Sequence, residues 1–472
     1  MIIRSIVVSV AVGTAAIALT AAPAAAAGSR QPVLVHVSRI DHQDIPSAST
    51  CEPDTLVEPD VAVSPVNPNI AVAAAHDCRF ADGGAVDISY AWTHDGGQTW
   101  HHAPMPGITT ANGGVWDRAS DPVVAFGPDG SVYISVLDIS LNCPSAVSVS
   151  RSTDGGATFG APVLAHESNT CNYSDDKNFL IVDNGRHSPH RGRLYQFWTP
   201  FLGGRFGSGS QQVVRWSDDH GQTWSHTVAL TPRGIFTQNS QPVIKPNGTI
   251  VDTYLSFGAA GGDEGPESRI GGNTDALAAN AAAPADRIAA RVSRNGGRTW
   301  SKSFTVTSRA GEGPAGIRCC LPSAAGDPTT GRMYAAWIRP DSKAVMLTSS
   351  KDGKTWSKAA QVTPTAPRKD YVNVDVSAYG GKVLVSTGLH GRRYVQQEVL
   401  ASTYPSAFSA PLKLGPPSDL KYAAVAGGKF PGDYIGTAVT HSRAYAVWCR
   451  SGKPADPNAK FHQVMWGATL RM

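Results

Sequence analysis

One eight-residue pattern recurs along the chain and constrains its fold more than any other feature. The full copies are THDGGQTW (93–100), STDGGATF (152–159), SDDHGQTW (217–224) and SRNGGRTW (293–300), and SKDGKTW (350–356) is one residue shorter. Glycine accepts positive φ, and a short Asp or Asn side chain bonds nearby backbone N–H groups. Each octet therefore predicts a tight hairpin, ending in an aromatic ring that can pack between neighbouring sheets.

The octets recur at a period of roughly 60 residues, which is the spacing of a repeat architecture. One interval is longer because it contains an Ala/Gly-rich insert, 258–286, and a decayed sixth copy is STYPSAF, 402–408. Before each octet lie a short alternating run, a turn, a second apolar run and a third. Four short strands per unit predict an all-β chain folded as a β-propeller.

The two ends of the chain predict how this propeller closes. A last unit has three strands, within 432–439, 443–448 and 461–470, and the chain then ends. The strand PVLVHV, 32–37, precedes the first unit and is available as its fourth strand. We therefore expect seven blades closed by the N-terminal strand, with six blades as the alternative. Closure also removes the exposed sheet edges that favour aggregation.

The first 27 residues predict export. Arg4 precedes an apolar stretch that is short for a membrane span, and Ala25 and Ala27 fit a cleavage site. The expected organisation is a signal peptide, 1–27, followed by one propeller domain, 28–472, secreted without a membrane anchor. The formal net charge is +4 with no basic run, so nucleic acid is not an expected partner.

Seven cysteines fit an oxidising compartment and leave one without a partner inside the chain. Pairing Cys51 with Cys78, and Cys143 with Cys171, would tie the approach to a first strand to a neighbouring loop. For Cys319–Cys320 two readings stay open: a disulfide between adjacent residues, or buried thiols with one bonded to Cys449.

The octet pattern S/T-x-D-x-G-x-T-W resembles the Asp-box, also called the bacterial neuraminidase repeat. By this resemblance the chain is similar to the sialidase (neuraminidase) superfamily of propellers over nearly all of residues 28–472. The resemblance implies a glycan-directed hydrolase, such as an exo-sialidase, with a glycan substrate. It implies no cofactor, leaves a structural calcium ion open, and fits a monomer. The octet Asp residues themselves are expected to be structural.

The resemblance also implies where the chemistry lies: on the face formed by the starts of first strands and by the loops between second and third strands. Sialidases use a tyrosine nucleophile, acidic groups and three arginines on the substrate carboxylate, because guanidinium forks match carboxylates. The catalytic candidates here are Asp60, Asp77, Tyr434 and Glu264. The substrate-binding candidates are Arg318, Arg339, Arg450, Asp121, Asp176 and Asp433. No metal ligands are assigned.

Two other functions stay open. A polysaccharide lyase would use His76, His390 or Tyr434 as the base that removes a proton next to a uronate carboxylate. A non-catalytic glycan- or protein-binding propeller is favoured by the lack of an Arg-Ile-Pro motif before the first octet. A repeated structural role at strand entries fits Asp60, Asp121, Asp176 and Asp433 as well as catalysis does.

Overall fold

The computed structural model describes residues 31–41, 45, 50–143, 145–168, 170–171, 173–202, 209–233, 235–257, 287–311 and 313–472. The expected signal peptide, 1–27, and the insert that carries Glu264 lie outside these ranges. Regular structure in the described part is β-strand apart from short 3₁₀ turns such as η1 (Thr110–Asn112) and η4 (Leu420–Tyr422). The prediction of an all-β chain is therefore confirmed. No helix among the described residues is long and apolar enough to cross a membrane.

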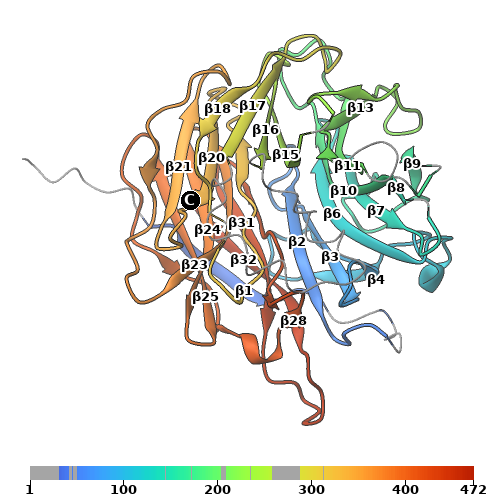
Figure 1. Ribbon diagram of the computed structural model, residues 1–472. Coiled ribbons are helices and arrows are strands. Elements are labelled where there is room, and N and C mark those ends of the chain that lie inside the picture. Colours follow the sequence, from blue (N-terminus) through green and yellow to red (C-terminus); the bar gives the residue numbers. More distant parts are fainter. Residues whose placement is uncertain are drawn as a thin grey trace, which may run out of the picture.

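The strands form units of four antiparallel strands in chain order (Figure 1). The first unit is β2 (Leu56–Val63), β3 (Ala71–Arg79), β4 (Ala85–Thr93) and β5 (His101–Pro104). The second is β6 (Arg118–Phe126), β7 (Val132–Ile139), β8 (Ser145–Ser152) and β9 (Val163–Glu167). The third is β10 (Tyr173–Val182), β11 (Leu194–Leu202), β13 (Val213–Ser217) and β14 (Val228–Ala229), with β12 (Gly209–Ser210) paired to β11. One bridge, Ala85 to Ala119, joins the first two units into a single sheet.

The later units repeat this plan. The fourth is β15 (Thr237–Ile244), β16 (Ile250–Ser256), β17 (Arg287–Ser293) and β18 (Phe304–Thr307). The fifth is β19 (Ser323–Gly326), β20 (Met333–Ile338), β21 (Val345–Ser350) and β22 (Ala360–Gln361). The sixth is β23 (Asp370–Tyr379), β24 (Lys382–Gly391), β25 (Tyr394–Thr403) and β26 (Leu412–Lys413), with β27 (Ser418–Asp419) also on β25. A hairpin of β28 (Ala424–Val425) and β29 (Lys429–Phe430) follows.

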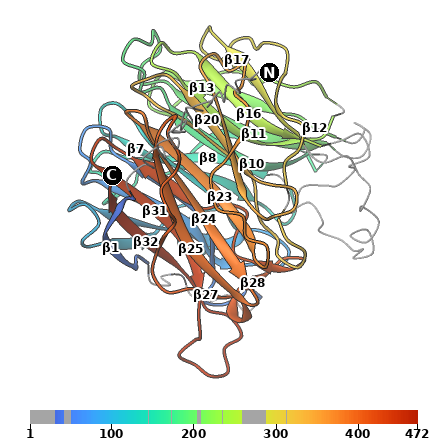
Figure 2. The same ribbon diagram turned by 90° about the vertical axis from the view of Figure 1, so that its left-hand side faces the viewer.

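The last unit combines both ends of the chain. It consists of β30 (Gly436–Val439), β31 (Arg443–Ser451), β32 (Gln463–Arg471) and β1 (Val33–Arg39). Strand β1 pairs antiparallel with β32, from Val33 opposite Arg471 to Arg39 opposite Trp466. Figure 2 shows the blue β1 beside the red β32 and β31. The expected pairing of the N-terminal strand is thus observed.

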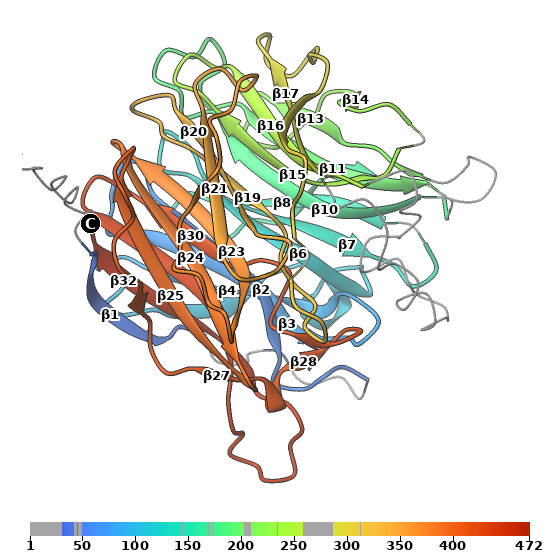
Figure 3. The same cartoon turned by 60° about the vertical axis from the view of Figure 1, so that its left-hand side comes forward.

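Contacts between first strands run around a ring. Strand β2 contacts β6, β6 contacts β10, and the series continues through β15, β19, β23 and β30 back to β2. An apolar cluster lies between the first and last units and includes Leu56, Ala73, Tyr445 and Val447. Figure 3 accordingly shows the red and orange C-terminal sheets next to the blue N-terminal one. The arrangement is propeller-like, and its axis runs along the first strands.

The octets form the predicted turns between third and fourth strands. In the first, the Asp95 carboxylate accepts the backbone N–H of Thr99 at 3.0 Å and the Thr99 hydroxyl at 2.6 Å. The Thr93 hydroxyl accepts the N–H of Gly97, whose φ of 81° suits glycine. A Cβ at Gly97 would also collide with the Thr469 hydroxyl. These carboxylates are part of the scaffold.

The octet aromatic rings pack on the preceding unit. Trp100 lies edge-on to Tyr445 of the last unit, with ring centroids 6.4 Å apart. Phe159 meets Tyr90 at 4.9 Å, and Trp300 meets Phe197 at 6.0 Å. In the decayed sixth copy, Tyr404 takes the same role against Tyr334 at 5.2 Å. The octets therefore join neighbouring units.

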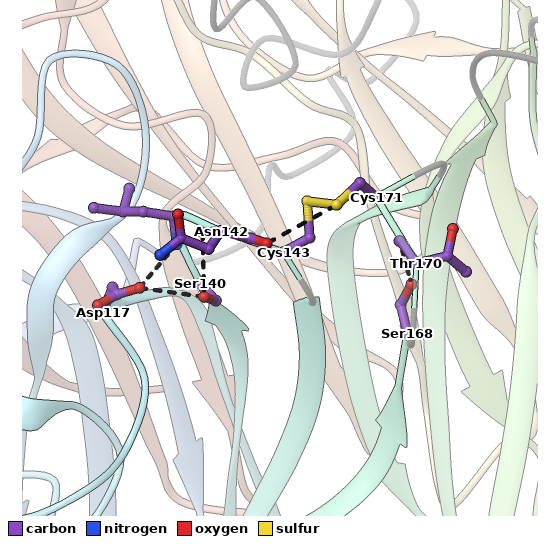
Figure 4. Close-up of a disulfide and its surroundings, with 8 residues drawn as sticks. Asp117, Ser140, Asn142, Cys143, Ser168, Thr170 and Cys171 are labelled. Atoms are coloured by element: carbon purple, nitrogen blue, oxygen red, sulfur yellow. Dashed lines mark hydrogen bonds between the residues drawn. A yellow bond between two sulfur atoms is a disulfide. The ribbon is translucent and has the colours of Figure 1, made fainter.

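Disulfides tie the loops at the opposite face, away from the octets. The expected pairs Cys51–Cys78 and Cys143–Cys171 are both present. Figure 4 shows Cys143–Cys171 joining the β7–β8 loop to the approach of β10, beside Asp117, which accepts the N–H of Leu141 at 2.8 Å. Cys319 is bonded to Cys320, and Cys449 is a buried free thiol in β31. Of the two readings for Cys319–Cys320, the adjacent disulfide is the one observed.

Candidate functional site

A cavity of ≈ 640 Å³ follows the axis and is lined by the first strand of every unit. This volume is within the range of small-molecule and sugar sites, about 300–1,000 Å³. The residues at the strand starts include Asp60, Lys177, Asn239, Asp375 and Tyr434. The lining at the strand ends includes Pro65, Arg186, Arg191, Thr329 and His441. Two of the predicted catalytic residues, Asp60 and Tyr434, therefore share the cavity.

The two ends of this axial cavity differ in exposure. Arg186, Arg191 and His441, at the end beside the octet turns, are exposed. At the other end Lys177 is 4% exposed and Asn239 is fully buried. The sequence analysis expected the ligand face at this second end, the starts of first strands, where Asp60, Asp375 and Tyr434 are half-buried. We call the first end of the cavity the octet-side mouth and the second, at the strand starts, the closed end.

The β28–β29 hairpin lies behind the closed end. Val425 donates its N–H to Glu52 at 3.1 Å, and the N–H of Arg318 bonds the Lys429 carbonyl at 3.0 Å. The Phe430 ring lies against the guanidinium groups of Arg79 and Arg318, each 4.7 Å from its centroid. This hairpin therefore packs against the residues that precede β2 and β19, on the face where the sequence predicted a mouth.

A repeated bulge places polar side chains at the closed end. Strand register shifts where β2, β6, β10, β15 and β23 begin. The bulge residues have positive φ although none is glycine: Glu58 (56°), Asp121 (48°), Lys177 (44°), Asn239 (61°) and Asn373 (53°). Such conformations are uncommon for non-glycine residues and persist where surrounding contacts impose them.

Lys177 crosses the axis at the closed end. It begins in the third unit, yet its Nζ lies 3.6 Å from the centroid of the Tyr434 ring, just before β30. Its nearest carboxylate oxygen is Asp121 Oδ2 at 4.0 Å, which is beyond hydrogen-bond distance. Within the described residues the structure gives this ammonium no hydrogen bond. The three N–H donors of the Lys177 ammonium are thus buried at the closed end of the cavity.

Behind Lys177 lies a buried cluster of Glu58, His76 and Asp121. His76 Nε2 lies 3.3 Å from Glu58 Oε2 and accepts the N–H of Asp121 at 2.6 Å. Burial alone would raise the pKa of Asp121, but the charge of Lys177 and the hydrogen bond with His76 hold the pKa below the ordinary value. The donor atoms of the three residues lie within 4.8 Å of one another, as metal ligands would. However, the His76 nitrogen that faces the cluster already accepts an N–H, and Lys177 adds a positive charge, so the arrangement does not fit a metal ion.

Burial raises the pKa of two carboxyl groups at the closed end, Asp375 and Asp60. Asp375 accepts the hydroxyls of Ser323 at 2.5 Å and Thr437 at 2.6 Å, and burial raises its pKa to about 7. Asp60 accepts the N–H of Val124 at 2.7 Å, and burial raises its pKa as well. The negative charge of Asp60 adds to the upward shift at Asp375. A carboxylic acid that holds its proton near neutral pH is suited to donate it to a leaving group.

The three candidate arginines do not converge on one point. Arg318 pairs with Asp433 at 3.0 Å, near the closed end. Arg339 forms a two-pronged pair with Asp341 at the surface, at 2.7 and 2.8 Å. Arg450 donates to the Pro416 carbonyl at 3.2 Å and lies over Trp466. Each guanidinium thus has a different local partner, and none of the three lines the axial cavity.

The remaining candidates also have defined places. Asp77 is buried inside the first unit, where it accepts the Ser89 hydroxyl at 2.6 Å, and it does not line the cavity. Asp176 accepts the N–H of Lys177 at 2.7 Å and contacts the Gln238 amide. Among the bases considered for a lyase, His390 bonds the Arg392 carbonyl at 2.8 Å, and His76 belongs to the cluster above. Glu264 lies outside the described residues.

Comparison with protein-family models and with curated proteins gives no match. Among solved structures, the chain is similar to a protein of unknown function from Dyadobacter fermentans (12% identity, 92% of this chain and 99% of that chain, TM-score 0.48). It is also similar to a leech intramolecular trans-sialidase (12%, 77% and 70%, 0.47). A third similar structure is a Penicillium chrysogenum α-L-arabinanase (11%, 94% and 98%, 0.43). At these identities and TM-scores the likeness carries no activity over to this chain.

Four residues of the cavity were not selected as site candidates, although weaker patterns in the sequence point to them. Asp375 occupies the same strand-start position as Asp60, and Lys177 the same bulge position as Glu58, so the repeat phase could have selected both. Arg186 and Arg191 lie in the long β10–β11 turn, NGRHSPHRGR, whose arginines and histidines are unusual in a chain with few charged clusters. Turns on the octet side were expected to be structural, and these two arginines were therefore passed over.

Proposed function

We propose that this protein is a secreted, glycan-directed glycoside hydrolase of the sialidase superfamily. In this proposal it is a monomeric seven-bladed propeller closed by its N-terminal strand. The ring of first-strand contacts, the β1–β32 pairing and the octet repeats support the fold. The leader sequence and the disulfides support secretion.

The observation that carries the proposal is that Asp375, whose pKa burial raises to about 7, and Tyr434 both line the axial cavity. Glycoside hydrolysis needs an acid for the leaving oxygen and a second group at the anomeric carbon. Asp375 is the acid, because its pKa of about 7 keeps much of it protonated near neutral pH. Tyr434 is the nucleophile, and Asp60 is the neighbouring carboxylate. No cofactor takes part in this proposal.

The test is glycan hydrolysis by the purified protein, with release of sugar from a fluorogenic sialoside and from a sialylated glycoprotein. We expect Asp375→Asn and Tyr434→Phe each to lower turnover by about 10²–10⁴-fold, the usual size of a general acid–base contribution. Asp456→Asn, an exposed carboxylate far from the cavity lining, is the matched control and should retain activity.

Activity that survives both Asp375→Asn and Tyr434→Phe would reject this site. No release from any substrate would reject the hydrolase. The second candidate would then be a glycan-binding propeller. One observation favours it: both Asp60 and Asp375 are already engaged by groups of neighbouring units, which is also how a purely structural carboxylate behaves.

A further inference from the structure

We infer that the octet-side face of the third, fourth and fifth units binds an acidic polysaccharide, a sugar chain that repeats carboxylate or sulfate groups. Four turns form this surface, which we call the cationic face: 183–193, 245–249, 293–300 and 350–356. The inference goes beyond the proposed function, because it adds a binding surface on the outside of the molecule and does not depend on hydrolysis.

The charge of the octets changes sign along the chain. The acidic and basic residues of the first three octets are all aspartates: Asp95, Asp154, Asp218 and Asp219. The fourth octet, SRNGGRTW, carries Arg294 and Arg298 and has Asn295 where the others have Asp, and the fifth, SKDGKTW, carries Lys351 and Lys354. Hydrogen bonds among its Ser, Asn, Gly and Thr residues hold the fourth turn, as in the other octets, so the turn itself does not account for two arginines.

Hydrogen bonds join the four turns into one surface. Arg193, in the β10–β11 turn, donates to a carbonyl of the fourth octet at 3.3 Å. His187 of the same turn donates its N–H to the carbonyl of Pro246, in the β15–β16 turn, at 2.9 Å. Lys245 Nζ then donates to a carbonyl of the fifth octet at 2.5 Å. Residues that are far apart in the chain therefore contribute to a continuous face.

Cations dominate this face. The exposed cations are Arg186, Arg191, Arg294, Arg298, Lys351 and Lys354. Among the described residues, the ion pair of these turns is Arg193 with Asp218 at 2.7 Å, and the six exposed cations take part in none. The acids of the four turns are Asp183, which is buried and bonded by a serine hydroxyl, and Asp352, which accepts an N–H at 2.8 Å. An excess of unpaired cations attracts a polyanion.

The titration of one residue reports the same positive potential. Burial and then the charges of Arg193 and Arg298 lower the pKa of His190, which lies between the β10–β11 turn and the fourth octet. Neighbouring cations disfavour a further positive charge, which is why the pKa falls. The charges of these turns therefore act together on a shared site.

The kind of partner follows from what the face offers besides charge. Single-stranded nucleic acids stack bases on aromatic side chains, and membrane-surface segments insert apolar ones. The exposed large apolar side chains of the described residues all lie outside the four turns. Exposed Asn247, Thr299 and Thr355 offer polar groups to sugar hydroxyls. Charge with polar side chains and without apolar ones fits an acidic polysaccharide.

The experiment measures binding by calorimetry at several salt concentrations. The probes are heparin, which carries sulfates and carboxylates, polygalacturonate, which carries carboxylates, and dextran, which is neutral. We expect both acidic polymers to bind and dextran not to bind, with an affinity that falls as salt screens the exposed charges. Gel filtration of each polymer after the titration shows whether it was cleaved, so binding and hydrolysis are read separately.

A matched pair of lysine variants locates the contact. Lys351→Gln combined with Lys354→Gln should weaken heparin binding severalfold at low salt. Lys453→Gln combined with Lys460→Gln makes the same charge change at exposed lysines outside the four turns and should leave the affinity nearly unchanged. Thermal unfolding of both variants checks that the fold is retained.

The arginines of the fourth octet extend the test. Adding Arg294→Gln and Arg298→Gln to the first lysine pair should bring the loss of affinity to roughly tenfold or more, because several exposed charge contacts are removed together. The salt dependence should weaken in parallel. Arg186 and Arg191 also line the axial cavity and are therefore left unchanged.

Three results would overturn the inference. One is dextran binding as tight as that of the acidic polymers, and another is an equal loss of affinity in the two lysine pairs. The third is tighter binding of a single-stranded oligonucleotide or of anionic lipid vesicles, lost in the same variants, which would assign the face to another partner. Binding of acidic polymers without hydrolysis of any glycan would support the cationic face and reject the hydrolase. Hydrolysis without such binding would do the reverse.

Discussion

Aspartates in two regions of this molecule behave in opposite ways. In the octets, Asp95, Asp154 and Asp219 lie near the surface and have their pKa lowered to about 2, since hydrogen bonds from the Thr just before the octet's aromatic residue outweigh a slight burial. At the closed end, burial raises the pKa of Asp375 to about 7. The same side chain is a fixed anion in one region and a proton carrier in the other.

The difference follows from where the partners come from. The Asp154 carboxylate is bonded by Ser152 and Thr158, two and four residues away, in a turn open to water. The Asp375 carboxylate is bonded by Ser323 and Thr437, which belong to neighbouring units, and it is half-buried in the axial cavity. Local hydrogen bonds to an exposed anion stabilise its charge, whereas desolvation favours the neutral acid.

The largest effect on stability should come from an octet ring rather than from its carboxylate. Trp300→Ala removes a partly buried indole from the cluster between the third and fourth units, and we expect it to lower the free energy of unfolding by about 3 kcal/mol. Denaturant unfolding measures this change.

The control for this measurement is Val115→Ala, because the Val115 side chain is 81% exposed. Its cost should stay within about 0.5 kcal/mol. A Trp300→Ala cost as small as that of the control would mean that the octet rings do not hold neighbouring units together.

The next effect separates the two kinds of aspartate by pH. Because the pKa of Asp375 is raised on folding, its contribution to stability is full below about pH 4 and is lost as pH rises through about 7. Asp375→Asn does not titrate, so between pH 5 and pH 8 its stability should improve relative to the parent by about 2 kcal/mol. Urea unfolding at several pH values measures the difference.

Asp456→Asn serves again as the control, and its offset from the parent should stay constant over the same range. A constant offset for Asp375→Asn as well would show that this carboxyl is ionised at pH 5. It would then be unsuited to the acid role proposed above.

How much of this molecule the sequence predicts depends on whether the partners of a residue lie nearby in the chain or in other units. The octet turns, the four-strand units and the disulfides Cys51–Cys78 and Cys143–Cys171 follow from patterns within tens of residues. The placement of Asp60 and Tyr434 on the axis follows from the phase of the repeat.

The chemistry of the closed end does not follow from local pattern. The contact of Lys177 with Tyr434 joins residues from distant units, and the partners of Asp375 lie 52 and 62 residues away. Arg318, Arg339 and Arg450 share a residue type and a predicted face, yet each is bound to its own partner. Residue type and strand phase therefore locate a face, whereas burial and pairing decide which side chains act together.

The smallest effect tests whether an octet needs an acid at all. Asn295 replaces Asp in the fourth octet and keeps the turn, with its Oδ1 accepting the N–H of Thr299 at 3.0 Å. Asp154→Asn should therefore cost less than about 1 kcal/mol at pH 7, since a neutral acceptor replaces a charged one. Asp154→Ala, which leaves the Thr158 N–H without its acceptor, should cost more than Asp154→Asn.

Because the pKa of Asp154 is lowered on folding, its charge-dependent contribution is present above about pH 4 and lost as pH falls through about 2, so the cost of Asp154→Asn should shrink on acidification. Thermal unfolding of the pair between pH 7 and pH 3 measures both differences. An Asn variant as costly as the Ala variant would mean that the octet turn depends on the negative charge, and the fourth octet would then need its own explanation.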